Sequence, residues 1–152
     1  MSRTTAAAVI GGAVLALTMT TAPAASAQPE GRVGQIQNLH FGRCLAVNPD
    51  QTVGLGPCVP VPPFLWDVPS EGTGQVRSLA ANACLTDVDT SNPWGHAVLL
   101  PCTGDLRQVW EFTGPDGPFI KNVLTGRYLK ANDSEGVYVG SQTGSHPEWA
   151  VR

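Results

Sequence analysis

The hydrophobic positions divide the chain into two parts with different patterns. A largely apolar run, AAAVIGGAVLALTM, lies near the start, whereas short stretches of alternating apolar and polar residues follow after residue 27. Alternation with a period of two, in β-branched stretches separated by glycine, is typical of short β-strands. No stretch after residue 27 has the longer periodicity of a helix. The pattern therefore predicts an all-β protein.

The alternation repeats along the chain. Three segments of about 40 residues align with one another, at 35–68, 75–112 and 119–152. In the second we expect strands at 75–79, 84–88, 97–100 and 109–112, with turns near Asn82, Asn92-Pro93 and Thr103-Gly104-Asp105. Four short strands in each of three units predict a barrel with pseudo-threefold symmetry and one shared core.

One tryptophan recurs in register in each unit. Trp66, Trp110 and Trp149 are separated by 44 and 39 residues, and each lies eight residues after a cysteine or the serine that replaces it. A large aromatic residue that recurs in this way is typical of a core position. We therefore expect all three indoles to be buried.

The first 27 residues have the features of a secretory signal peptide. Arg3 precedes the apolar run, and Ala25-Ser26-Ala27 is a small-residue cleavage pattern. The apolar core is shorter than the roughly twenty residues of a membrane-spanning helix. We expect removal of 1–27 and release of one domain, 28–152, as a secreted, extracellular protein.

Composition and charge narrow the range of partners. All twelve acidic residues but only eight of the nine basic ones lie after residue 27, so 28–152 has a formal charge of 8 minus 12, or −4. A mildly acidic surface argues against nucleic acid and anionic membranes as partners. We expect a monomer.

Four cysteines allow three disulfide pairings in an exported protein. The repeat favours the pairing within units, Cys44 with Cys58 and Cys84 with Cys102, while Tyr128 and Ser141 occupy these places in the third unit. Spacings of 14 and 18 residues lack the close Cys-x-x-Cys pairs of a zinc site, so disulfides are favoured over a metal.

The three units resemble the repeats of ricin B-chain type β-trefoil lectins. The resemblance lies in Cys-Leu, a glycine-bearing turn, a second cysteine and Gln108-Val109-Trp110, and it covers nearly all of 28–152. The third unit, with Thr125-Gly126-Arg127 before its second strand, looks more like the single-domain actinohivin type. The resemblance implies a β-trefoil fold and carbohydrate binding.

The chain departs from this family where the family binds sugar. In the family an aspartate two residues after the first cysteine accepts hydrogen bonds from two sugar hydroxyls. That place holds Ala46, Thr86 and Lys130 here, and only Gln108 keeps the glutamine of the Gln-x-Trp motif. A lysine donates only, so Lys130 would suit an acidic sugar. We therefore expect weak, altered glycan sites.

The second unit is the strongest candidate for such a site. A tryptophan on an exposed loop can stack on a sugar ring while carboxylate and amide groups bind its hydroxyls. The candidate residues of this unit are Asp87, Asp89, Asn92, Trp94, His96 and Gln108. The alternative is that Trp94 only covers a loop and that the aspartates bond their own backbone.

The third unit adds two candidates, Asn132 and Tyr138, which match sugar-holding residues of actinohivin-like repeats. The first unit offers only Asn48, Asp50 and Gln51, and we expect it to be the poorest site.

No enzyme motif is present in the sequence. The three histidines occupy unmatched places in their units, and there is no metal-binding His-Glu-x-x-His motif, Gly-x-Ser-x-Gly motif or phosphate loop. We expect neither catalysis nor a cofactor or metal. The partner would be a glycan or polysaccharide. The alternative is a trefoil that binds a secreted protein, for instance as a protease inhibitor, through residues 59–63 or 92–96.

We predict that the secreted protein begins at Gln28 and contains no free thiol. Each disulfide removes two hydrogens, so intact mass spectrometry before and after reduction would reveal both cross-links. A peptide that joins Cys44 to Cys84 or Cys102 would contradict the alignment of the repeats.

Overall fold

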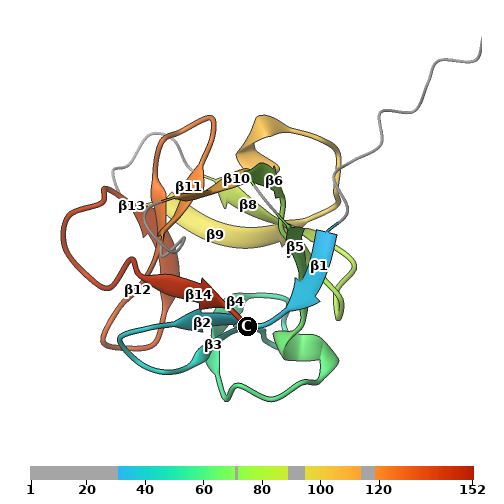
Figure 1. Ribbon diagram of the computed structural model, residues 1–152, viewed down its shortest axis with the longest axis vertical. Helices are drawn as coiled ribbons and strands as arrows, with labels where there is room; N and C mark the ends of the chain where they lie inside the picture. The colour runs from blue at the N-terminus through green and yellow to red at the C-terminus, as the bar shows by residue number, and fades with distance from the viewer. Residues whose placement is uncertain (1–30, 71, 89–94, 114–118) are drawn as a thin grey trace, which may run out of the picture.

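The computed structural model describes residues 31–70, 72–88, 95–113 and 119–152, and these residues fold into a three-lobed β-structure (Figure 1). The strands of the first unit and the segment before it are β1 (Gly31–Gly34), β2 (Ile36–Asn38), β3 (Cys44–Val47), β4 (Val53–Gly56) and β5 (Trp66–Pro69). The second unit contains β6 (Thr73–Gln75), β7 (Arg77–Ser78), β8 (Cys84–Val88), β9 (Gly95–Leu100) and β10 (Val109–Thr113). The third contains β11 (Phe119–Asn122), β12 (Tyr128–Ala131), β13 (Val137–Gly140) and β14 (Trp149–Val151). Short 3₁₀ turns, η1 (Pro62–Phe64) and η2 (Leu106–Gln108), precede β5 and β10.

The first and last strands of the units form a closed barrel. β5 pairs with β1 and with β7 of the next unit, and β10 likewise pairs with β6 and with β11. β14 pairs with β2, which joins the third unit back to the first. Within the described residues, closure leaves no long open edge in this layer.

The middle strands of each unit form a hairpin, and the three hairpins together cover one end of the barrel. They are β3–β4, β8–β9 and β12–β13, and we call them the hairpin cap. Neighbouring hairpins contact one another through pairing of β9 with β13 and through the bridges Thr52–Val98 and Gly54–Gly136. The predicted pseudo-threefold β-trefoil is confirmed.

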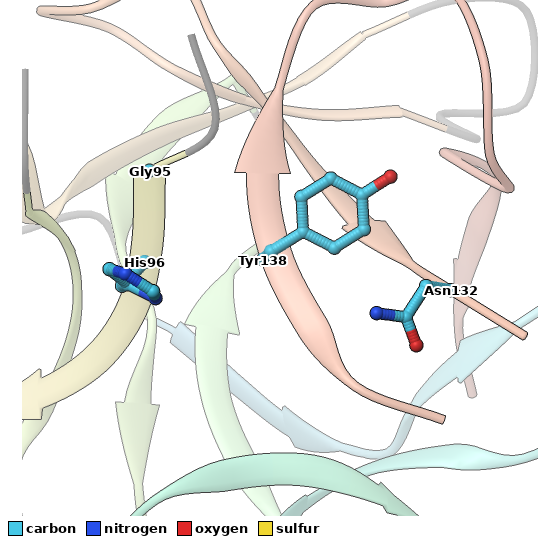
Figure 2. A pocket seen from close by; sticks show the side chains of 4 residues that line it. All are labelled: Gly95, His96, Asn132 and Tyr138. Atoms are coloured by element: carbon cyan, nitrogen blue, oxygen red, sulfur yellow. The ribbon is translucent and has the colours of Figure 1, made fainter. Parts of the chain in front are cut away.

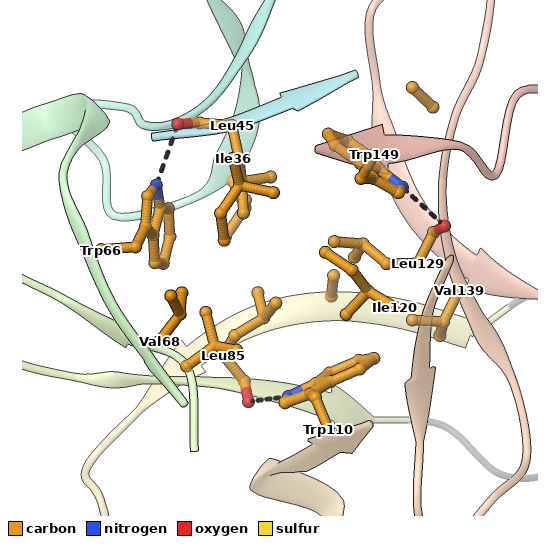
Figure 3. Close-up of a cluster of buried hydrophobic side chains, with 14 residues drawn as sticks. Ile36, Leu45, Trp66, Val68, Leu85, Trp110, Ile120, Leu129, Val139 and Trp149 are labelled. Atoms are coloured by element: carbon orange, nitrogen blue, oxygen red, sulfur yellow. Dashed lines mark hydrogen bonds between the residues drawn. The ribbon is translucent and has the colours of Figure 1, made fainter. Parts of the chain in front are cut away.

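The three tryptophans occupy equivalent places in the shared core (Figure 3). All three have no exposed surface, as predicted. Each indole N–H donates to the backbone carbonyl of the leucine that is second in the first hairpin strand of its own unit: Trp66 to Leu45 (3.0 Å), Trp110 to Leu85 (2.8 Å) and Trp149 to Leu129 (2.9 Å). Burial of the rings therefore leaves no indole donor unsatisfied.

The second unit differs from the expected strands only at its start. The expected strand at 75–79 is two strands, β6 and β7, interrupted at the buried Val76. The interruption marks a change of partner, because β6 pairs with β10 whereas β7 pairs with β5 and β8. The other three strands lie where the alternation predicts them, within one or two residues.

Both predicted disulfides are present, Cys44–Cys58 and Cys84–Cys102, and neither leaves a free cysteine in the described residues. Each joins the first strand of a hairpin to the segment that follows the second strand. In the chain-entropy model, loops of 14 and 18 residues contribute about 3 kcal/mol each.

We predict that Trp110→Ala lowers the free energy of unfolding by about 3–5 kcal/mol, because it empties a core site and removes the donor to Leu85. Chemical denaturation would measure the loss. Leu106→Ala is the control, because Leu106 is 51% exposed and its truncation should cost little. Equal losses in the two variants would contradict the core role of Trp110.

Candidate functional site

A pocket of about 310 Å³ lies where the second and third units meet. It is lined by Gly95 and His96 of β9, Tyr138 of β13, and Asn132 in the turn that follows β12 (Figure 2). We call it the seam pocket. Its volume is at the lower end of the roughly 300–1,000 Å³ of small-ligand sites. Three of the residues proposed from the sequence, His96, Asn132 and Tyr138, are therefore brought together.

Strand pairing between units creates this arrangement. In the register of β9 and β13, Tyr138 lies opposite His96, and Val139 lies opposite Gly95. Directly opposed residues project from the same face of a sheet, so the imidazole and the phenol become neighbours. His96 is exposed and Tyr138 is half-buried, so both rings are accessible at the surface.

The Asn132 side chain shapes the turn on the other side of the pocket. Its Oδ1 accepts hydrogen bonds from the backbone N–H groups of Ser134 (3.0 Å) and Gly136 (2.9 Å). This side-chain turn positions β13 and therefore Tyr138. In Figure 2 the amide nitrogen of Asn132 points toward the interior of the pocket. It is a hydrogen-bond donor.

A buried ion pair lies beside the seam pocket and joins the same two units. The guanidinium of Arg127, 12% exposed, pairs with the fully buried carboxylate of Asp87. Arg127 Nε donates to Asp87 Oδ2 (3.1 Å), and the Thr125 hydroxyl donates to the same oxygen. A Cβ at position 95 would lie only 2.5 Å from the guanidinium, so Gly95 allows this close approach.

The expectation that Asp87 binds sugar hydroxyls is therefore corrected. Its carboxylate has no exposed surface and accepts hydrogen bonds from Arg127 and Thr125. A carboxylate one residue beyond the position of the family aspartate points into the junction between units.

Gln108 is likewise a structural residue. It is 2% exposed, and its Oε1 accepts from the N–H of Thr103 (2.9 Å). Its Nε2 donates to the carbonyl of Pro101 (2.8 Å) and to the hydroxyl of Thr86 (3.2 Å). The side chain holds the segment after β9 against β8, which corrects its expected role in sugar contact. The remaining candidates, Asp89, Asn92 and Trp94, lie outside the described residues.

The aspartate that binds sugar in the family is replaced in the three units by Ala46, Thr86 and Lys130, and all three residues are buried. The ammonium of Lys130 donates to the carbonyls of Ser141 (2.9 Å) and Thr143 (2.7 Å). Burial lowers the pKa of Lys130, and the carboxylate of Glu148 acts in the opposite direction. Because its ammonium binds the protein's own backbone, the expected contact with an acidic sugar is not formed by Lys130.

Other kinds of site find no support in the described part of the chain. No group of three or more His, Cys, Asp or Glu side chains there is placed to hold a metal ion. Among the same residues, no helix has the length and apolar character needed to cross a membrane.

A family model for the ricin-type beta-trefoil lectin domain matches residues 32–147. The chain belongs to this family. Ricin-type lectin domains bind carbohydrate, which is the function that the resemblance of the repeats implied. No curated protein sequence is significantly similar to the chain.

Solved structures with the same fold include natural and designed members. The designed threefold-symmetric protein ThreeFoil is 15% identical with a TM-score of 0.67, over 78% of this chain and 96% of its own. A Polyporus squamosus lectin, solved with the epitope Neu5Acα2-6Galβ1-4GlcNAc, is 19% identical with a TM-score of 0.64, over 83% of this chain. A non-toxic homologue of type II RIPs from Momordica charantia (bitter gourd), solved with α-methyl-D-galactoside, is 26% identical with a TM-score of 0.65, over 80% of this chain. This chain spans 50% and 48% of the two natural proteins.

Sequence reasoning missed the part that Thr125, Arg127 and Gly95 play in this ricin-type lectin domain. A signal was available, because Thr125-Gly126-Arg127 is the motif that marked the third unit as similar to actinohivin. Only the structure shows that this motif binds Asp87 of another unit.

We predict that Asp87→Ala lowers the free energy of unfolding by about 3 kcal/mol, because it removes a fully buried carboxylate that pairs with the guanidinium of Arg127 and accepts a hydrogen bond from Thr125. Thermal and chemical denaturation would measure the loss. Asp133→Ala is the matched control, since Asp133 is 92% exposed in its pair with His146 and its removal should change stability little. A stability change as small as the control's would show that Asp87 is not a structural ion-pair partner.

Proposed function

We propose that the protein is a secreted lectin that binds glycans weakly through the seam pocket. The single observation that carries this proposal is the pairing of β9 with β13, which places His96 beside Tyr138 at an accessible surface. Membership of the ricin-type lectin family supports a carbohydrate as the ligand.

The residues of the seam pocket offer the contacts that a sugar ring needs. The phenol ring of Tyr138 provides an apolar surface for the C–H face of a pyranose. His96 and the Asn132 amide provide hydrogen-bonding groups for hydroxyls at the edge of the ring. The pocket differs in position from the family's sites, because it uses two neighbouring units rather than one.

The affinity for a single sugar should be low. Among the described residues that line the seam pocket there is no carboxylate, so these residues offer neutral groups in place of the strong paired acceptor of the family. Each neutral hydrogen bond contributes only about 0.5–1.5 kcal/mol after exchange with water. Dissociation constants of roughly millimolar to high micromolar follow, and useful binding requires several sugars or several copies of the protein on one surface.

A second candidate function is binding of a protein through the segment 59–63. Val59 and Val61 are 38% and 43% exposed, and the prolines beside them restrict the backbone. A stiff, apolar loop loses little entropy when it docks on a protein surface. A tight one-to-one complex with a secreted protease, together with no polysaccharide binding, would favour this function over the lectin.

We predict that Tyr138→Ala lowers the affinity for a bound polysaccharide at least about tenfold, since it removes the stacking surface, and that His96→Ala has a smaller effect in the same direction. A glycan array would first identify the ligand, and calorimetry or surface plasmon resonance would then compare the variants. The matched control is Asp50→Ala in the first unit, because Asp50 is not among the residues that line the seam pocket. The carboxylate of Asp50 accepts hydrogen bonds from the hydroxyl and the backbone N–H of Thr52, and these bonds lower its pKa. Replacement of Asp50 by alanine should not change the affinity for the polysaccharide. Equal affinity for Tyr138→Ala and the unsubstituted protein would contradict the proposed site.

A further inference from the structure

The same structural position is filled differently in the three units. In each unit this position is formed by the third residue of the first hairpin strand and by the residue two places before the tryptophan. In the second unit it is closed by the hydrogen bond between Thr86 and Gln108 (3.2 Å). In the third it is closed by Lys130, whose ammonium reaches the carbonyls beyond β13.

The first unit has no polar pair at this position. Ala46 stands where Thr86 and Lys130 stand, and Phe64 stands where Gln108 stands. A pocket of about 590 Å³ results, which is well within the range of small-molecule sites. We call it the first-unit pocket. Its apolar lining includes Ala46, Val47, Leu55, Pro57, Pro63 and Phe64.

The walls of the first-unit pocket are rigid. The Phe64 ring packs directly against the backbone of Gly56, where any Cβ would collide with it. Proline fixes the backbone at Pro57 and Pro63, and the disulfide at Cys58 holds the segment that follows Pro57. A preformed pocket costs little entropy when a ligand enters it.

The described polar side chains at the rim are Arg43, Asn48 and the exposed Gln51, and the first two are already bound within the protein. The guanidinium of Arg43 pairs with the carboxylate of Glu135, which neutralises its charge. The Asn48 amide donates to the Thr52 hydroxyl (2.9 Å). The described lining residues include no carboxylate, so a sugar would lose water from its hydroxyls and find no paired acceptor among them.

We propose that the first-unit pocket binds the aromatic ring of a small uncharged molecule instead of a sugar. Such a ring can lie against the Phe64 ring in an offset or edge-to-face arrangement and contact the proline rings beside it. It brings no hydroxyls that the apolar wall formed by Ala46 and Leu55 would leave unsatisfied. The pocket is separate from the seam pocket, which has different lining residues.

The test is a titration of the ¹⁵N-labelled protein, with phenol as the probe and cyclohexanol and D-galactose as matched comparisons. Phenol should shift the amide signals of Leu55, Gly56 and Ala81 saturably, with a dissociation constant of about a millimolar. Cyclohexanol should bind at least threefold more weakly, and D-galactose should leave these signals unchanged. No saturable shift with phenol, equal binding of cyclohexanol, or equal shifts with galactose would overturn the proposal.

Two variants assign the binding to this pocket. Ala46→Thr combined with Phe64→Gln installs the pair that closes the second unit, and it should weaken phenol binding at least tenfold. Ala80→Gln enlarges an exposed residue that lines the pocket without changing the core. It therefore provides a second measurement of phenol binding if the double variant folds poorly. It should weaken binding at least threefold. Tyr138→Ala, in the seam pocket, should leave phenol binding unchanged. Unchanged binding in Ala80→Gln, or loss of binding in Tyr138→Ala, would place the ring elsewhere and overturn the proposal.

Discussion

Three indole-to-carbonyl hydrogen bonds fix the hairpin cap onto the barrel. Each tryptophan lies at or next to the start of the last strand of its unit and donates to the leucine in the first hairpin strand of the same unit. Barrel and cap are therefore joined at three equivalent points, around which the remaining core side chains pack. Both pockets depend on this arrangement, because each is lined in part by residues of the cap. The third unit has no cysteine pair, yet Trp149 makes the same bond to Leu129 there.

Fixed backbone geometry leaves the side chains of the cap free to diverge. One position accommodates a hydroxyl with an amide in the second unit, an ammonium in the third, and an alanine with a phenyl ring in the first. In the second and third units, Gln108 and Lys130 bind backbone carbonyls at this position. These side chains therefore contribute to structure at a place where the family commonly binds ligand. Pockets remain in the first unit and at the contact between the hairpins of the second and third units. Divergence of this kind explains how a threefold fold can carry unequal sites.

The features that repeat along the chain could be predicted from the sequence, whereas those that join different units could not. The strands of the second unit, the buried tryptophans and the disulfides follow from alternation and register within about 40 residues. The burial of Asp87 depends on Arg127, which lies 40 residues away, and no local pattern reveals that partner. His96 and Tyr138 were each proposed separately, but their contact requires the β9–β13 register. The first-unit pocket could not be predicted, because it is defined by the absence of sugar-binding groups at Ala46 and Phe64, and an absence gives no positive signal in the sequence.

The closure of the barrel has a consequence for the order of folding. β2 meets β14 only after nearly the whole chain is available, and two backbone bonds between Gln35 and Arg152 (2.8 and 2.9 Å) complete the ring. Pairing between segments so distant in sequence forms slowly. Until then β2 presents an open edge on which another chain could form a strand. The two disulfides span only 14 and 18 residues, so they can form while the barrel is still open and hold two hairpins in native form until the last strand arrives.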